Sequence, residues 1–130
     1  MKRIITYGTF DCFHIGHLRL LEKAASLGDS LYVGVSTDQF NALKDKKAMI
    51  PFQDRLEIVS SIKHVHTVFP EKDWDQKIDD IKKYDIDMFV IGDDWAGHFD
   101  EMLKEYCEVR YLPRTNGISS TAIRKKISAC

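Results

Sequence analysis

Short β-prone segments alternate with helical segments along this chain, and this alternation constrains the fold more than any other feature. Five runs rich in β-branched, aromatic and other large apolar residues are each followed by a glycine, a proline or a small polar residue. Near-continuous apolar runs of this kind are typical of buried parallel strands. We therefore expect strands over residues 4–7, 31–36, 66–69, 88–91 and 109–112.

Helical periodicity occupies the segments between these runs. Leu18, Leu21 and Ala25 follow the i, i+3, i+7 spacing of one helix face, and Gly28 ends that stretch. Pro51 suits the first turn of the next helix. The helices that we expect cover residues 17–27, 51–62, 75–83, 98–106 and roughly 120–128. Repeated strand–helix alternation predicts an α/β fold: a Rossmann-like open parallel five-stranded sheet with helices on both faces.

Length and charge narrow the class of protein further. The chain has 130 residues, which predicts a single domain over residues 1–130. Its 19 lysines and arginines nearly balance 20 aspartates and glutamates, which argues against a basic nucleic-acid-binding surface. The apolar runs are too short to span a bilayer or to form a signal peptide. Cys12, Cys107 and Cys130 lack CxxC spacing and indicate free thiols. We expect a cytoplasmic protein with neither a nucleic-acid nor a membrane partner.

The segment after the first predicted strand is suited to phosphate binding. His14 and His17 lie three residues apart where the chain enters a helix, and Gly16 leaves room for a ligand to approach the backbone. A helix N-terminus offers N–H donors and partial positive charge to such a ligand. Other interpretations stay open: histidines without a role, a zinc pair that lacks an evident third ligand, or a Cys12–His14 nucleophile pair.

Charged and polar residues also follow the second, fourth and fifth predicted strands. The lysines of residues 44–47 form either a mobile cover for a polyphosphate or a solvated loop. Residues 92–95 suit a base or ribose pocket, or a simple turn beside a packed tryptophan. Arg114 precedes three hydroxyl residues that form a second anion site or merely cap the last helix: Ser119, Ser120 and Thr121. Carboxyl ends of parallel strands share one edge, so both anion sites are expected there.

These motifs resemble the signatures of the cytidylyltransferase family within the HxGH nucleotidylyltransferase superfamily. Residues 14–17 (HIGH) match the HxGH signature, and residues 6–11 (TYGTFD) precede it as in that family. Residues 114–121 (RTNGISST) are similar to the family motif RTEGISTT, and residues 92–95 (GDDW) fit the same group. The similarity extends over essentially the whole chain.

The resemblance implies an enzyme that transfers CMP from CTP to a small phosphorylated alcohol and releases pyrophosphate. The acceptor that it favours is sn-glycerol 3-phosphate, giving CDP-glycerol for a teichoic acid or capsule polymer. Alternatives are another acceptor (phosphocholine, phosphoethanolamine or another polyol phosphate), an adenylyltransferase of the same superfamily, or a non-catalytic nucleotide-binding regulatory domain. The resemblance further implies Mg²⁺ carried with CTP, no metal ligands from the protein, and a homodimer.

The resemblance also assigns roles to individual residues. It implies catalytic roles for His14, His17, Lys46 and Arg114. It implies CTP binding by Thr9, Phe10, Lys44, Gly92, Asp94, Ser119, Ser120 and Thr121. It implies acceptor binding by Asp11, Arg55, Lys63, His66 and Trp74. The chain departs from the family pattern at Asn116 and Ser120, and on the acceptor side at Lys63 and His66. The last two departures predict either looser recognition of glycerol 3-phosphate or, if peripheral, no effect.

Overall fold

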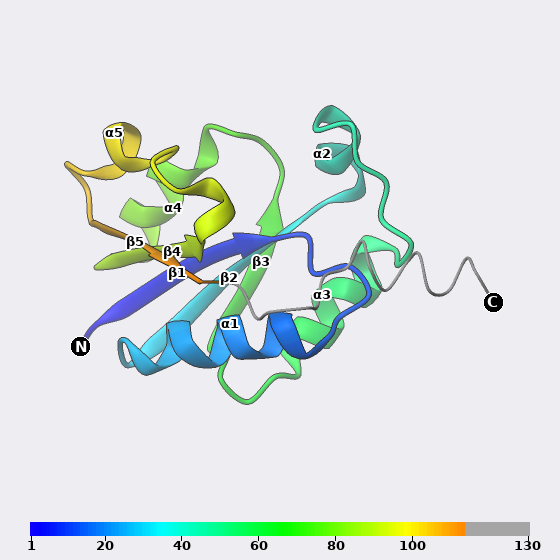
Figure 1. Cartoon of the computed structure of the whole chain (residues 1–130), viewed down its shortest axis with the longest axis horizontal. Helices are drawn as coiled ribbons and strands as arrows, with labels where there is room; N and C mark the ends of the chain where they lie inside the picture. Colours follow the sequence, from blue (N-terminus) through cyan, green and yellow to red (C-terminus); the bar gives the residue numbers. More distant parts are fainter. Residues whose placement is uncertain (114–130) are drawn as a thin grey trace.

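Five parallel strands form one sheet in the computed structural model, which describes residues 1–113 (Figure 1). Their spatial order is β3-β2-β1-β4-β5, and every neighbouring pair is parallel. The strands are β1 (Arg3–Gly8), β2 (Ser30–Ser36), β3 (Thr67–Glu71), β4 (Met88–Gly92) and β5 (Glu108–Leu112). This architecture confirms the predicted Rossmann-like open parallel five-stranded sheet.

Helices cover both faces of the sheet, as expected. They are α1 (Ile15–Ser26), α2 (Asp38–Leu43), α3 (Phe52–Ser60), α4 (Gln76–Lys83), the short 3₁₀ helix η1 (Asp93–Trp95) and α5 (Asp100–Leu103). Helices α1 and α3 lie on one face, and α4 and α5 lie on the other (Figure 1). None of the helices in residues 1–113 is long and apolar enough to cross a membrane.

Alternation along the strands builds a core on each side of the sheet. In β1, Ile4 packs in the cluster that includes Leu21 of α1, whereas its neighbour Ile5 packs in the cluster that includes Ile81 of α4. On the side of the sheet that faces α4, position 34 of β2 must be a glycine to leave room for the Tyr7 ring, because a Cβ on Gly34 would lie 2.5 Å from that ring. Burial on both faces explains the near-continuous apolar runs of the central strands β1, β2 and β4.

Several boundaries differ from the sequence-based expectation. Strand β3 was expected to stop before Pro70 but runs to Glu71, because it is an edge strand. The Pro70 carbonyl accepts from the Gln76 side chain, so the polar backbone groups of Pro70 face away from β2. The N–H that proline lacks would therefore not have formed a hydrogen bond to β2. Helix α2 was not predicted; the Thr37 side chain caps it by accepting from the Phe40 N–H.

The fourth predicted helix, over residues 98–106, is shorter than its apolar spacing indicated. Helix α5 covers Asp100–Leu103 alone, and the chain then turns directly into β5. The N–H groups of Tyr106 and Cys107 both bond to the Leu103 carbonyl, which closes that turn. The expected last helix, over roughly residues 120–128, lies outside the described residues.

Candidate active site

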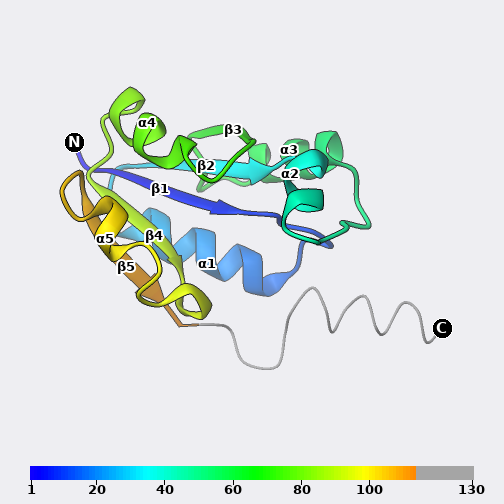
Figure 2. The same ribbon diagram turned by 90° about the horizontal axis from the view of Figure 1, so that it is seen from above.

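A cavity of about 600 Å³ opens at the carboxyl ends of the strands. It lies where the strand order reverses between β1 and β4, which is the usual ligand position in open α/β sheets. Figure 2 shows α2 and the loop that follows it beyond the carboxyl ends of β1 and β2. Of the predicted site residues, the cavity brings together Thr9, Phe10, Asp11, His14, His17, Lys44, Lys46, Trp74, Gly92 and Asp94.

The two histidines form the start of α1. His14 is its N-cap, and its Nδ1 accepts from the Gly16 N–H at 3.0 Å. His17 Nδ1 accepts in turn from the His14 N–H at 3.2 Å, so each ring satisfies a backbone donor of the first turn. The rings stack with their centroids 3.9 Å apart. With both Nδ1 atoms used as acceptors, the proton of each neutral ring is on Nε2.

The surroundings keep both imidazoles neutral at neutral pH. Burial lowers the pKa of His14. Burial, together with the neighbouring His14, lowers the pKa of His17 to about 4, against an opposite effect of Asp11. Each ring is therefore a neutral N–H donor on the cavity wall, suited to phosphoryl oxygens. The zinc interpretation finds no support within residues 1–113, where no group of three or more metal-ligating side chains could hold an ion.

The loop between β1 and α1 adopts an unusual backbone conformation. Phe10 and Cys12 have φ angles of 55° and 49°, in the left-handed region that bulky residues rarely occupy. This conformation places the Phe10 ring in the core, with its centroid 5.4 Å from that of His17. Non-glycine residues held in this region cluster at functional sites. The Phe10 ring therefore packs beside the His17 ring at the cavity.

Asp11 and Arg55 hold the loops around the cavity. The Asp11 carboxylate accepts from the N–H groups of Met49 and Ile50, both at 3.0 Å, and so joins the β1–α1 loop to the segment after the lysines. The Arg55 side chain is fully buried. Its guanidinium donates to the backbone carbonyls of Thr9, Ser36 and Ile50 and pairs with Asp38 at 2.7 Å. Arg55 thus positions the surrounding loops and does not line the cavity. Its acceptor-binding role stays a prediction.

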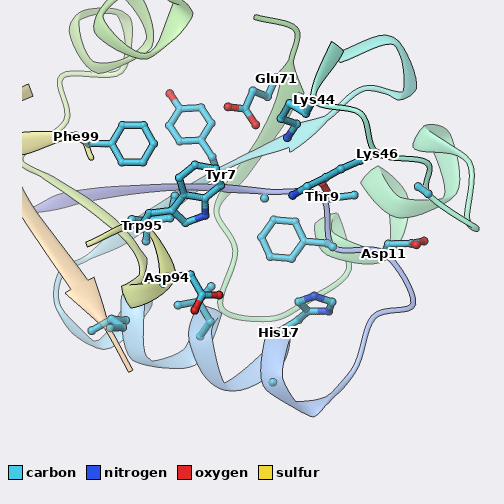
Figure 3. A pocket seen from close by; sticks show the side chains of 18 of the residues that line it. Tyr7, Thr9, Asp11, His17, Lys44, Lys46, Glu71, Asp94, Trp95 and Phe99 are labelled. Carbon is cyan, nitrogen blue, oxygen red and sulfur yellow. The ribbon is translucent and has the colours of Figure 1, made fainter. Parts of the chain in front are cut away.

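Lys44 and Lys46 lie across the cavity from His17 (Figure 3). Lys44 Nζ donates to Ser36 Oγ at 3.1 Å and lies 4.5 Å from the centroid of the Phe40 ring. Burial lowers the pKa of Lys44 to about 8, with Glu71 opposing this shift and nearby cations adding to it. Imidazole N–H donors on one side and ammonium groups on the other make this cavity suited to a polyphosphate.

Comparison with known proteins agrees with this geometry. The cytidylyltransferase-like family matches residues 5–126, which is nearly the whole chain. The chain belongs to the cytidylyltransferase-like family. It is 60% identical to the glycerol-3-phosphate cytidylyltransferase of Bacillus spizizenii, over 99% of both chains. It is 51% identical to the glycerol-3-phosphate cytidylyltransferase of Staphylococcus aureus, over 98% of this chain and 96% of that one.

A solved structure confirms the fold of this cytidylyltransferase-like protein. The lipopolysaccharide core biosynthesis protein from Thermoplasma volcanium superposes with a TM-score of 0.80, over 89% of this chain and 99% of that one. Their sequence identity is 22%, so this comparison concerns the fold alone. The predicted phosphate-binding residues of the last motif lie outside the described residues: Arg114, Ser119, Ser120 and Thr121.

The structure does not bring Lys63 and His66 of this cytidylyltransferase-like protein to the cavity. Both are exposed and precede β3, whereas the cavity lies at the carboxyl ends of the strands. The His66 N–H bonds to the carbonyl of Leu31, at the start of β2. Side chains before a parallel strand lie at the opposite edge from those after it. An acceptor-binding role for these two residues stays a prediction.

We expect the double variant Lys63→Arg, His66→Asp to leave the acceptor KM within about twofold of the original, since surface changes away from a site have small effects. Steady-state pyrophosphate release at varied concentrations of glycerol 3-phosphate measures this KM. A clear fall in KM, with CTP affinity unchanged, would instead place these residues at an acceptor site.

Sequence reasoning missed the buried charged pair of the cytidylyltransferase-like site. Glu71 and Lys77 line the cavity, and their side chains are 4% and 3% exposed with the charged atoms 2.8 Å apart. Tyr7 also lines it, and its hydroxyl donates to Asp80 at 2.8 Å. Burial, with Asp80 adding to it, raises the pKa of the Tyr7 phenol, which stays protonated. Glu71 is the last residue of β3. A charged residue at the carboxyl end of a strand is the sequence feature that could have indicated a site residue here.

We expect kcat/KM for the anionic substrates to fall as the pH rises above about 8, where Lys44 loses its proton in the free protein. Its lowered pKa means that the charge is fully present only below that value. Lys44→Arg stays charged and should keep kcat/KM level through that range. Profiles of kcat/KM from pH 6 to about 9.5 test this. The same decrease of kcat/KM at high pH in the unaltered protein and in Lys44→Arg would contradict it.

Proposed function

We propose that this protein transfers CMP from CTP to sn-glycerol 3-phosphate, giving CDP-glycerol and pyrophosphate. The observation that carries the proposal is the near-full-length identity of 51–60% to proteins named glycerol-3-phosphate cytidylyltransferase. A cavity that combines neutral imidazole donors with lysines supports it from the physical side. CDP-glycerol would supply glycerol phosphate units to a cell-surface polymer such as a teichoic acid or a capsule.

The proposed chemistry is an in-line displacement. A phosphate oxygen of the acceptor attacks the α-phosphorus of CTP and forms the new P–O bond, while the bond to the bridging oxygen of the β-phosphate breaks and pyrophosphate leaves with the electron pair. The nucleophile is already anionic at neutral pH, so the reaction needs positioning and charge stabilisation more than a base. The Nε2–H donors of His14 and His17 would contact the oxygens on which negative charge grows.

Lysine charges complete the proposed mechanism. Lys44 and Lys46 would contact the triphosphate or the acceptor phosphate, since both ammonium-bearing residues line the cavity. Arg114 and the hydroxyl residues of the last motif would add contacts to the leaving phosphates. Mg²⁺ would enter as part of the MgCTP substrate, because this ion keeps several waters and binds readily through phosphate oxygens.

The test of this function is a pyrophosphate-release screen with CTP and a panel of phosphorylated polyols and amino alcohols. We expect turnover with glycerol 3-phosphate and CDP-glycerol as the nucleotide product. Tight CTP binding without pyrophosphate release from any acceptor would favour a non-catalytic nucleotide-binding domain instead. Turnover with ATP in place of CTP would favour an adenylyltransferase.

We also propose that the protein is a cytoplasmic homodimer. Both substrates, CTP and a phosphorylated alcohol, are charged and are made inside cells. Light scattering during size-exclusion chromatography measures the oligomeric state, and cell fractionation measures the location.

A further inference from the structure

The lysine segment, residues 44–47, is attached at both ends to the loop between β1 and α1, which carries Thr9 and Asp11 (Figure 3). After the segment, the backbone N–H groups of residues 49–50 donate to the Asp11 carboxylate. Before it, the Thr9 hydroxyl donates to Oδ1 of Asn41, in helix α2, at 3.0 Å. Both attachments therefore fix the lysine segment relative to the loop that leads to the histidines.

The backbone of Asn41 also shapes the start of the lysine segment. Its carbonyl accepts from the N–H groups of Lys44 at 3.0 Å and Lys46 at 2.8 Å. Asp45, between them, has a φ angle of 58°, and its N–H bonds to a carbonyl of the same last turn of α2. These bonds form a Schellman motif, which ends the helix and turns the chain back on it. Asn41 thus holds three residues of the cavity wall: Thr9, Lys44 and Lys46.

Asparagine is a costly residue at this buried position. Asn41 is 1% exposed, and its Nδ2 has no hydrogen-bond partner among the residues that the structure describes. A buried donor without a partner destabilises a fold, whereas an apolar side chain of the same shape avoids that cost. Leucine has nearly the same branched shape as asparagine. Stability alone would therefore favour an apolar residue here, and the amide is better explained by what its oxygen does for Thr9.

We infer that Asn41 is a positioning residue for the transfer of CMP, because its side chain holds Thr9 and keeps the histidine loop in register with the lysine segment. The inference rests on the proposed function. Asn41 does not line the cavity, so it acts through Thr9, whose carbonyl is held on its other side by Arg55 at 2.8 Å. In the proposed reaction the histidines and the lysines contact the same substrate phosphates. A displacement of about 1 Å between such groups can lower a rate about 100-fold.

The experiment is a double-mutant cycle with Asn41→Leu and Thr9→Val, measured by pyrophosphate release from CTP and glycerol 3-phosphate. Each substitution keeps the branched shape of the side chain and removes one end of the hydrogen bond. We expect Asn41→Leu to lower kcat about 100-fold and to change the KM for CTP less than about threefold, because the binding groups remain but lose their register. Added to Thr9→Val, it should lower kcat less than about threefold further, because the bond is already absent.

Thermal unfolding and a matched variant separate positioning from a merely structural role. Asn41→Leu removes the unpartnered Nδ2, so its Tm should equal or exceed that of the unaltered protein. Gln39→Leu makes the same amide-to-leucine change at an exposed position of the same helix, away from the cavity, and should keep the original kcat. If Asn41→Leu does not fold, Asn41→Ala takes its place in the cycle, since it removes the same amide without adding volume.

The outcomes separate this inference from the function on which it rests. Absence of pyrophosphate release by the unaltered protein with any acceptor would contradict the proposed function itself. With an active unaltered protein, the inference fails if folded Asn41→Leu keeps the original kcat. It fails too if the effects of Asn41→Leu and Thr9→Val on kcat multiply, or if Tm falls together with kcat.

Discussion

Replacing either histidine of the α1 start by asparagine should lower kcat about 10²–10³-fold while the fold stays intact. Asparagine places an acceptor oxygen where the histidine has Nδ1, so His14→Asn can still accept from the Gly16 N–H, and His17→Asn from the His14 N–H. What each variant loses is the Nε2–H donor toward the reacting phosphate. Single-turnover and steady-state pyrophosphate release measure the fall, and the KM for CTP should change far less than kcat.

The matched control for these variants is His64→Asn. This histidine precedes β3, lies 3.7 Å from Glu22 and does not line the cavity, so its replacement should leave kcat unchanged. Alanine is the poorer choice at position 14, because it would also remove the helix cap, which is worth about 1 kcal/mol. Near-normal turnover of both His14→Asn and His17→Asn would show that the imidazoles serve only as caps.

The sheet was predictable because burial on both faces leaves a strong pattern in the sequence. Strands β1, β2 and β4 are buried at almost every position and carry short apolar runs, and the residues that end them are glycine or serine. The extension of β3 through Pro70 was not predictable, since it depends on β3 being at an edge. Helix α2 was missed because it is six residues long and buries only Phe40 and Asn41.

The site was predictable where its residues follow strands in the chain, and less so where contacts between distant segments decide a role. The histidines, Lys44 and Asp94 all follow strands and all line the cavity. No local pattern distinguishes the guanidinium of Arg55, which bonds to carbonyls of other segments, from one that binds a ligand. The position of Lys63 away from the cavity was predictable, because a residue that precedes a parallel strand lies at the opposite edge of the sheet.

Discrimination between nucleotides should be the largest effect in this protein, with kcat/KM for CTP exceeding that for UTP by about 10⁴. The cavity rim at the ends of β4 and β5 includes Gly92, Asp94 and Pro113. An ionised carboxylate only accepts hydrogen bonds, and proline has a carbonyl but no N–H. We therefore expect the Asp94 carboxylate to accept from the amino group of cytosine and to disfavour the carbonyl oxygen that uracil has in its place.

The variant Asp94→Asn tests whether that carboxylate carries the discrimination. An amide has a donor as well as an acceptor, so it can turn to meet the uracil oxygen. We expect the CTP-to-UTP ratio of kcat/KM to fall at least about tenfold, through both slower use of CTP and faster use of UTP. Asp93→Asn is the control, because this neighbouring residue of the same 3₁₀ helix is exposed and does not line the cavity. Competition assays with both nucleotides present measure the ratio directly. An equal fall in both variants would indicate a loss of net charge near the cavity, and an unchanged ratio in Asp94→Asn would assign cytosine recognition to backbone groups of the rim.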